Sequence, residues 1–360
     1  MNDLPPPRPV HYAEQSLLGA LLLEPHQLPD IRALEAEQFS NHAHGALFQA
    51  MRTVPPPDPA THRSDPAWLN AVLEAARARA PVLTVSYLHT LVQVCPCSQH
   101  APTYARMIRA DHARRTLLML AQRLAQTAID VTLPQPAAAT LAQAEALAQF
   151  LDTLAGQFAP HPGSLPRTSL PRPPAGRGSE EAFDEERLLL AAATAHPAAL
   201  KDMRWLQPND FTQSLHATVW ECLTSLVHRA EPVDPVTVLW EAQHRGLLAD
   251  GFAASDLMSL VSTPVGSPEY WGERVLQRAL LTCAFDVAAR IAAYAEGPAN
   301  TPHQLITGSR RALADLTAVR TRWQRSTATT PAAPRAPRSP AVSRAGPPPR
   351  AIAVGARTLR

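Results

Sequence analysis

The sequence predicts an all-α protein made of two tandem copies of one helical domain. Aromatic residues make up only 5% of the 360 residues, and β-branched residues rarely cluster, so a strand-rich fold lacks its usual building blocks. Apolar residues make up 46% and recur at helical spacing. The stretch that begins at Glu14 returns from Glu186 at a constant offset of 172 residues, which indicates a duplicated domain.

The matched positions of the two copies are mostly apolar or helix-terminal residues. The pairs are Glu14 and Glu186, Leu17 and Leu189, Leu18 and Leu190, Pro25 and Pro197, Phe39 and Phe211, His44 and His216, and Phe48 and Trp220. In the first copy, four leucines between residues 17 and 22 form the apolar stripe of a helix that ends near Pro25. The second copy has Ala193 and Thr194 in place of two of these leucines, so its first helix buries less apolar surface.

Capping residues mark where further helices begin and end. The predicted starts are Asn41, Asp65-Pro66 and Asp234-Pro235, the last two as a carboxylate N-cap followed by proline at the first helical position. Gly246 ends the third of these helices, with Leu247 packing back on the last turn. The proline-rich residues 55–65 are an insertion in a loop, absent from the second copy.

Each copy closes with two long amphipathic helices that form an αα-hairpin, at roughly 103–129 with 137–157 and 269–294 with 303–323. Composition then divides the chain into four parts. These are a first helical domain (1–158), a proline-rich linker (159–182), a second helical domain (183–324) and a disordered tail rich in proline, arginine and alanine (325–360). We expect the linker to act as an extended tether.

Two targeting signals are missing from the sequence. No run of 18 apolar residues suggests a membrane span, and the first ten residues lack the pattern of a signal peptide, so we expect a cytoplasmic protein without membrane contact. The four cysteines, Cys95, Cys97, Cys222 and Cys283, have no disulfide-framework spacing, which agrees with a reducing compartment.

Two stretches carry a resemblance to a known family. EQSLLGALLLEP (14–25) and EPVDPVTVLWEAQHRGLLADGFAASDLMSLV (231–261) both resemble the N-terminal domain of DnaB-type replicative helicases. The resemblance implies a globular helical head with a protruding hairpin through which subunits pair. In a fused chain the two hairpins could pair with each other, or the chain could form a homo-oligomer.

The sequence contains no phosphate-binding motif for a motor. The pattern G-x-x-x-x-G-K-[ST] needs a lysine, and the only lysine, Lys201, lies between Leu200 and Asp202 with no glycine nearby. The motor domain of the resembled helicases has no counterpart here. We therefore expect a protein that is not an enzyme and that needs no cofactor.

Two groups of residues suggest metal or catalytic chemistry, and we assign neither to it. Cys95, Cys97 and His100 lack both the usual zinc-ligand spacing and a second ligand pair, so we interpret them as ordinary residues at a helix end and predict no metal. His44 and its counterpart His216 lie on an apolar face near a helix start. That place favours packed, hydrogen-bonded histidines over catalytic bases.

Two sets of arginines are candidates for binding a partner. Arg106, Arg109, Arg114 and Arg115 line the first hairpin, where the second copy is more apolar; they form either a solvated face or a partner-binding surface. The chain has nine arginines and no acidic residue after Asp315. Within that tail, Arg335, Arg338, Arg344 and Arg350 are candidates for weak, sequence-blind DNA contact.

These observations favour a non-catalytic interaction protein of DNA replication. As the resemblance implies, its partner would be the replicative helicase, its primase or a helicase loader, bound through helical surfaces. One alternative is the head subunit of a split helicase whose motor is a separate chain, and another is a weak DNA-binding protein that uses its tail. A third, the helicase-binding domain of primases, would call for a zinc-binding or polymerase segment, which the sequence lacks.

Overall fold

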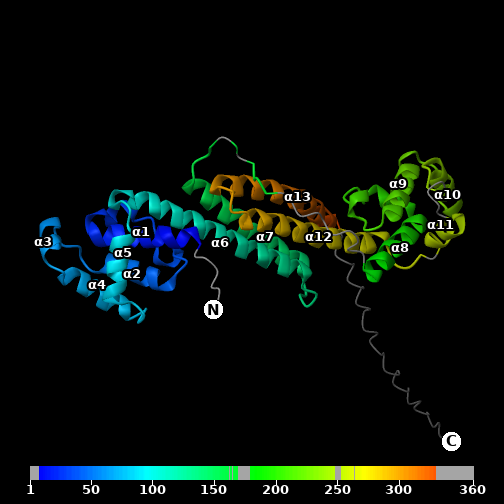
Figure 1. Cartoon of the computed structure of the whole chain (residues 1–360). Coiled ribbons are helices and arrows are strands. Elements are labelled where there is room, and N and C mark those ends of the chain that lie inside the picture. Colours follow the sequence, from blue (N-terminus) through cyan, green and yellow to red (C-terminus); the bar gives the residue numbers. More distant parts are fainter. Residues whose placement is uncertain are drawn as a thin grey trace, which may run out of the picture.

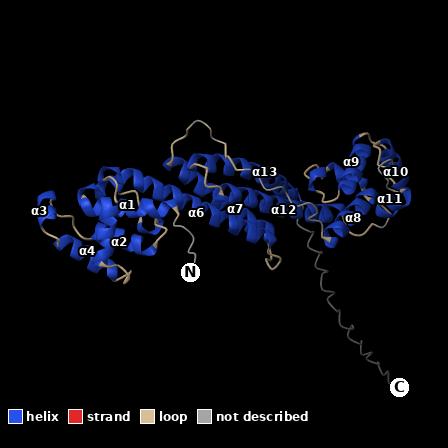
Figure 2. Cartoon of the chain, viewed as in Figure 1, coloured by secondary structure: helices blue, strands red, loops and turns tan. Residues whose placement is uncertain are grey.

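The computed structural model describes residues 8–161, 163, 165–168, 179–247, 253–262 and 264–329. Within these residues the protein is built from helices joined by loops, without a β-strand (Figure 2). The all-α prediction is therefore confirmed. Figure 1 shows two globular heads at opposite ends of the molecule and long helices between them.

The elements that the two copies share follow the same order, and among the described residues α3 and η3 occur in the first copy alone. The first copy contains α1 (Pro9–Leu23), η1 (Pro25–Ile31), η2 (Ala36–Gln38), α2 (His42–Thr53), α3 (Pro59–Ser64), α4 (Ala67–Arg77), α5 (Val85–Val94), η3 (Ser98–His100), α6 (Ala101–Ile129) and α7 (Pro136–Gln157). The second contains α8 (Glu180–Ala195), η4 (Pro197–Lys201), η5 (Pro208–Asp210), α9 (Ser214–His228), α10 (Pro235–His244), α11 (Ala254–Leu260), α12 (Pro268–Glu296) and α13 (Pro302–Thr329). The starts of η1, η2 and α2 recur in the second copy as the starts of η4, η5 and α9. Each lies 172 residues later, which is the offset of the sequence repeat.

Local side-chain chemistry accounts for the helix starts. The Asn41 carboxamide accepts hydrogen bonds from the N–H groups of Ala43 and His44 at 2.8 and 3.4 Å, as the sequence predicted. Asp234 caps α10 in the same way. For α4 the prediction was wrong by one position, because Pro66 has a near-helical backbone and is itself the N-cap; the Asp65 carboxylate still accepts the Ala67 N–H at 2.8 Å.

The insertion at 55–65 is not purely a loop, as the sequence had suggested. It contains the short helix α3, which begins at the N-cap Asp58 with Pro59 at the first helical position. The Asp58 carboxylate accepts hydrogen bonds from the N–H groups of two residues in the first turn. Asp58 and Pro59 thus form the same pair of a carboxylate and a following proline that occurs at Asp65 and Asp234.

Two helices of the second head end in the same hydrogen-bond pattern. After α10, the N–H of Leu247 bonds to the carbonyl of Ala242 at 3.1 Å, and Gly246 has a φ of +84°, which confirms the predicted Schellman ending. After α9, the N–H of Glu231 bonds to the carbonyl of Leu226 at 3.0 Å. There the left-handed position is held by Ala230, with a φ of +55°, although an L side chain disfavours that conformation.

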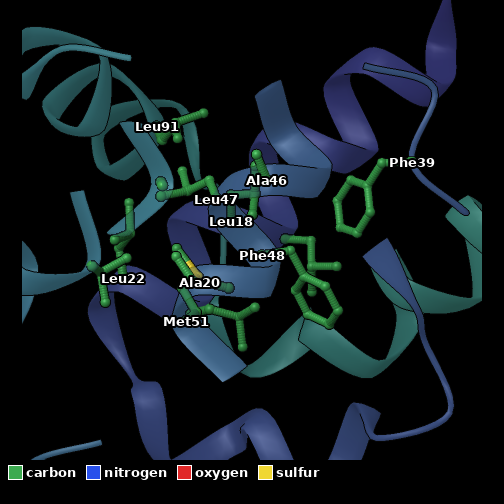
Figure 3. Close-up of a cluster of buried hydrophobic side chains, with 14 of the residues drawn as sticks. Leu18, Ala20, Leu22, Phe39, Ala46, Leu47, Phe48, Met51 and Leu91 are labelled. Atoms are coloured by element: carbon green, nitrogen blue, oxygen red, sulfur yellow. The ribbon is translucent and has the colours of Figure 1, made fainter. Parts of the chain in front are cut away.

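Each head has its own apolar core. In the first head, leucines of α1 pack against Leu47, Phe48 and Met51 of α2 and Leu91 of α5 (Figure 3). In the second head, Trp220 replaces Phe48 and is almost fully buried. The buried faces of α2 and α9 therefore correspond at the repeat offset.

A third core joins the two copies. The hairpin α6–α7 and the hairpin α12–α13 lie side by side between the heads, with α6 packed along α12 (Figure 1). Buried residues of all four helices form one cluster, among them Leu117, Leu147, Val287 and Leu305. The two hairpins thus pair within one chain and bury each other's apolar faces.

Candidate interaction surfaces

A buried carboxylate–imidazole pair fixes the start of α2 in the first head. Glu14 of α1 and His44 of α2 are both fully buried, with 2.7 Å between Glu14 Oε2 and His44 Nδ1. The second carboxylate oxygen accepts the N–H of Ser40 at 2.5 Å, and His44 Nε2 lies 2.6 Å from the hydroxyl of Tyr87 in α5. Three segments of the head therefore meet at one polar cluster.

The second head repeats this cluster with one part missing. His216 Nδ1 lies 2.6 Å from Glu186 Oε2, and Glu186 Oε1 accepts the N–H of Thr212 at 2.6 Å. Thr212 is the counterpart of Ser40 at the repeat offset. The described residues provide no hydroxyl for His216 Nε2 in place of Tyr87.

These histidines are packed and hydrogen-bonded, as the sequence predicted. Burial raises the pKa of Glu14, but the hydrogen bonds from His44 and Ser40 outweigh it and hold that pKa below the ordinary value of 4.5. The Glu14 and His44 side chains have no exposed surface, so a substrate cannot reach them. The arrangement is the same in both heads and is structural. It ties α2 and the loop before it to α1 in the first head, and α9 and the loop before it to α8 in the second.

Arg114, one of the four predicted arginines of α6, is bound to the second copy. Its guanidinium donates to the carbonyl of Ala295 at 3.0 Å, to that of Gly297 at 2.6 Å and to that of Asn300 at 2.5 Å. These carbonyls lie at the end of α12 and in the turn before α13. Burial lowers the pKa of this half-buried arginine, and the three carbonyls compensate its charge inside the contact.

The other three arginines of this set make different contacts. Arg115 bonds to Asp111 at 2.8 Å and to the carbonyl of Gln38 at 2.7 Å, both within the first copy. Arg109 donates to the Gln157 side chain at 3.1 Å. Arg106 is exposed and bonds to none of the described residues. The four residues thus form no single charged face.

The second copy has no counterpart of the Arg114 contact. The two long helices α6 and α12 each have 29 residues, and counting from their first residues places Leu281 where α6 has Arg114. Leu281 instead packs on the shared apolar core. The two hairpins therefore meet in an asymmetric pair, in which the arginine–carbonyl contact has no repeat-related twin, while the ion pairs Arg310–Asp152 and Arg320–Glu145 join α13 to α7.

Part of the linker also lies on the second hairpin, which corrects the expectation of an extended tether for those residues. The Asn300 side chain accepts the N–H of Arg167 at 2.8 Å and donates to the Thr168 hydroxyl at 2.7 Å, and Gln304 donates to the Gly163 carbonyl at 2.7 Å. Side chains of the second copy thus supply the hydrogen-bond partners that the linker's own composition lacks. No motif or spacing in the sequence indicates this role for Asn300.

A groove lies where the first head meets the tip of the second hairpin. It has a volume of about 670 Å³. Its lining comes from the start of α1, from α6 and from the turn between α12 and α13, and includes Arg8, Met107, Arg114, Arg115 and Pro298. Met107 is half exposed beside Arg106, so an apolar and a basic side chain share this part of α6.

Several predicted features take no part in these surfaces. Cys95 and Cys97 are free and partly buried, burial raises the pKa of the Cys95 thiol, and the described residues contain no cluster of three metal-ligand side chains. No helix in the described ranges has the length and apolar character needed to span a membrane. The tail arginines Arg335, Arg338, Arg344 and Arg350 lie outside the described residues.

Comparison with known proteins places both heads in one family. The family model described as the DnaB-like helicase N terminal domain matches residues 7–110 and 179–272, together more than half of the chain. The two matched segments contain the two heads and the beginnings of α6 and α12. No solved structure matches.

Two curated relatives are replicative helicases. The chain is 33% identical over 125 residues to the replicative DNA helicase DnaB of Geobacillus stearothermophilus, which covers 34% of this chain and 26% of that protein. It is 30% identical over 122 residues to the replicative DNA helicase DnaB of Mycobacterium leprae (strain TN), which covers 33% of this chain and 20% of that protein. The matches thus span 26% and 20% of the length of these two relatives.

Proposed function

Because this chain belongs to the family of DnaB-like helicase N-terminal domains, we propose that it is a non-catalytic interaction protein of DNA replication. In this proposal it binds the replicative helicase, its primase or a helicase loader through its helical surfaces and works in the cytoplasm. The family match covers only head-like segments, and the sequence lacks a phosphate-binding lysine motif, so the proposed role is binding and not unwinding.

The pairing of the two hairpins within one chain is the observation that carries this proposal. Each hairpin buries its apolar face against the other hairpin of the same chain, so neither hairpin needs another subunit to cover that face. The surfaces left for a partner are those of the two heads and the outer sides of the hairpins. The protein would then act as a preassembled pair of heads that a partner recognises from outside.

Arg106 and Arg109 remain our candidates for partner contact on the outside of the first hairpin. Arg106 is exposed next to the half-exposed Met107, a combination that suits an interface rim. Changing both arginines to glutamate should weaken capture of the partner without loss of helical content.

Size-exclusion chromatography with light scattering tests the proposal directly. The full chain is run alone and then mixed with the purified replicative helicase, primase or loader of the same organism. Co-elution with one of them, lost in the Arg106→Glu/Arg109→Glu variant, is the expected result. Separate elution from all three at micromolar concentration would refute it.

A split helicase is a second candidate function, favoured by the head-only family match. In that case a motor chain should unwind DNA only after this protein is added.

Weak DNA contact by the arginine-rich tail is a third candidate function. It should appear as binding that falls steeply between low and moderate salt, since phosphate contacts release counterions, and absence of binding at low salt would exclude it.

A further inference from the structure

The two heads differ in one groove, which is open in the second head and filled by a side chain in the first. The repeat offset identifies the residues that correspond at this place. On the second head, a groove of about 1020 Å³ runs between η4 and the last two turns of α9, and we call it the α9 groove. Its lining includes Lys201, Arg204, Leu206, Thr224, Val227 and His228. This lining has basic side chains and no acidic one.

In the first head, an arginine lies across the equivalent place. Arg52 of α2 donates to the Leu34 carbonyl at 3.2 Å and pairs with Glu35 at 2.5 Å. Its guanidinium carbon lies 5.9 Å from the centre of the Phe48 ring. The side chain therefore covers the ring and satisfies the carbonyl at the same time.

The second head has a short residue at this position. At the repeat offset, Thr224 stands in the place of Arg52, and Thr224 donates back to the Trp220 carbonyl of its own helix at 3.0 Å. Gln207 stands in the place of Glu35. The groove is thus left without the arginine that fills its counterpart and without the carboxylate that would pair with a cation there.

Part of the positive charge of the α9 groove comes from residues without a basic counterpart in the first head. Lys201, the only lysine of the chain, replaces Pro29, and His228 lies in the last turn of α9, beyond the repeat position at which α2 ends. Lys201, Arg204 and His228 are exposed, and none of them bonds to a described residue. Arg229 differs, because Glu231 and Glu241 already pair with it at 2.9 and 2.7 Å.

We propose that the α9 groove is a binding site for an acidic segment of a partner protein. A carboxylate entering it meets Lys201 and Arg204 without displacing an existing ion pair, and apolar neighbours of the carboxylate meet the edges of Leu206 and Val227. Nucleic acid fits less well, because a phosphate backbone needs a continuous basic track. The carboxylates of Asp202, Glu221 and Glu231 interrupt such a track on this head.

Fluorescence anisotropy with the full chain tests this site. The probe is a fluorescein-labelled peptide of alternating glutamate and leucine, and the reference is the same peptide with lysine in place of glutamate. We expect saturable binding of the glutamate peptide alone. Lys201→Glu and Arg204→Glu should each weaken binding about tenfold, because each change replaces a cation that attracts the peptide by an anion that repels it. The double change Thr224→Arg/Gln207→Glu, which copies both the arginine and its paired carboxylate from the first head, should weaken it as well.

The first head provides the matched control. Arg32 is the counterpart of Arg204 and is likewise exposed, so Arg32→Glu makes the same charge change outside the groove and should leave binding unaltered. Equal loss of binding in Arg32→Glu and Arg204→Glu would overturn the site, as would unchanged binding in Lys201→Glu and Arg204→Glu. Tighter binding of a single-stranded oligonucleotide that displaces the peptide would show a nucleic-acid site instead. Because the peptide is used alone, the result does not depend on which replication protein is the partner.

Discussion

Removal of Glu14 should destabilise the first head and leave the second head intact. Glu14 is fully buried and holds both the imidazole of His44 and the N–H of Ser40. Glu14→Ala leaves those two donors inside the core without an acceptor. Loss of one partner of a buried pair costs about 3–5 kcal/mol, which is a large fraction of the stability of a domain.

Hydrogen exchange resolved by peptides measures this effect in each head separately. A loss of about 3 kcal/mol corresponds to more than a hundredfold faster exchange wherever amides exchange through opening of the head. We expect this acceleration in α1 and α2 of Glu14→Ala, with α8 and α9 unchanged. Glu186→Ala should give the mirror result, because it makes the same two contacts in the second head.

The exposed Glu74 of α4 supplies the control for this experiment. Glu74→Ala removes a carboxylate from the same head without touching a hydrogen bond and should change exchange by less than threefold, as expected for about 0.5 kcal/mol. The reasoning fails if Glu14→Ala accelerates α1 and α2 by less than about tenfold, or if the two heads respond equally to it.

Three further predictions concern pH, helix ends and the contact between the copies. Because the folded state lowers the pKa of Glu14, its contribution is present above pH 4.5 and is lost as pH falls through the folded-state pKa, so urea midpoints of wild type and Glu14→Gln should converge in acid. Ala230→Gly should raise thermal stability by about 0.5–1 kcal/mol and Gly246→Ala should lower it by a similar amount, since both positions have a positive φ; equal signs in calorimetry would contradict this. Arg114→Ala removes three bonds from a cation to carbonyls and should cost about 2–4 kcal/mol of pairing between the hairpins. Faster hydrogen exchange in residues 295–301, with unchanged heads, is the expected result.

The sequence alone determined the helical class, the duplication and most helix ends. Such features follow from local chemistry: apolar spacing sets a helix face, a carboxylate or carboxamide caps a first turn, and glycine permits a left-handed residue. Asn41, Asp234 and Gly246 behave as predicted for this reason. The short helix α3 was missed although its cap is of the same type, because the surrounding prolines suggested a loop.

Only the tertiary structure decided which surfaces are buried and which remain for a partner. Arg114 and Arg106 are both arginines of one helix, yet the first is bound to carbonyls nearly two hundred residues away in sequence and the second is exposed. No spacing rule distinguishes them, because the difference arises from how the second hairpin lies on the first. The same holds for Arg52 and Thr224: the repeat identifies them as counterparts, but only their surroundings show that one fills a groove and the other leaves it open.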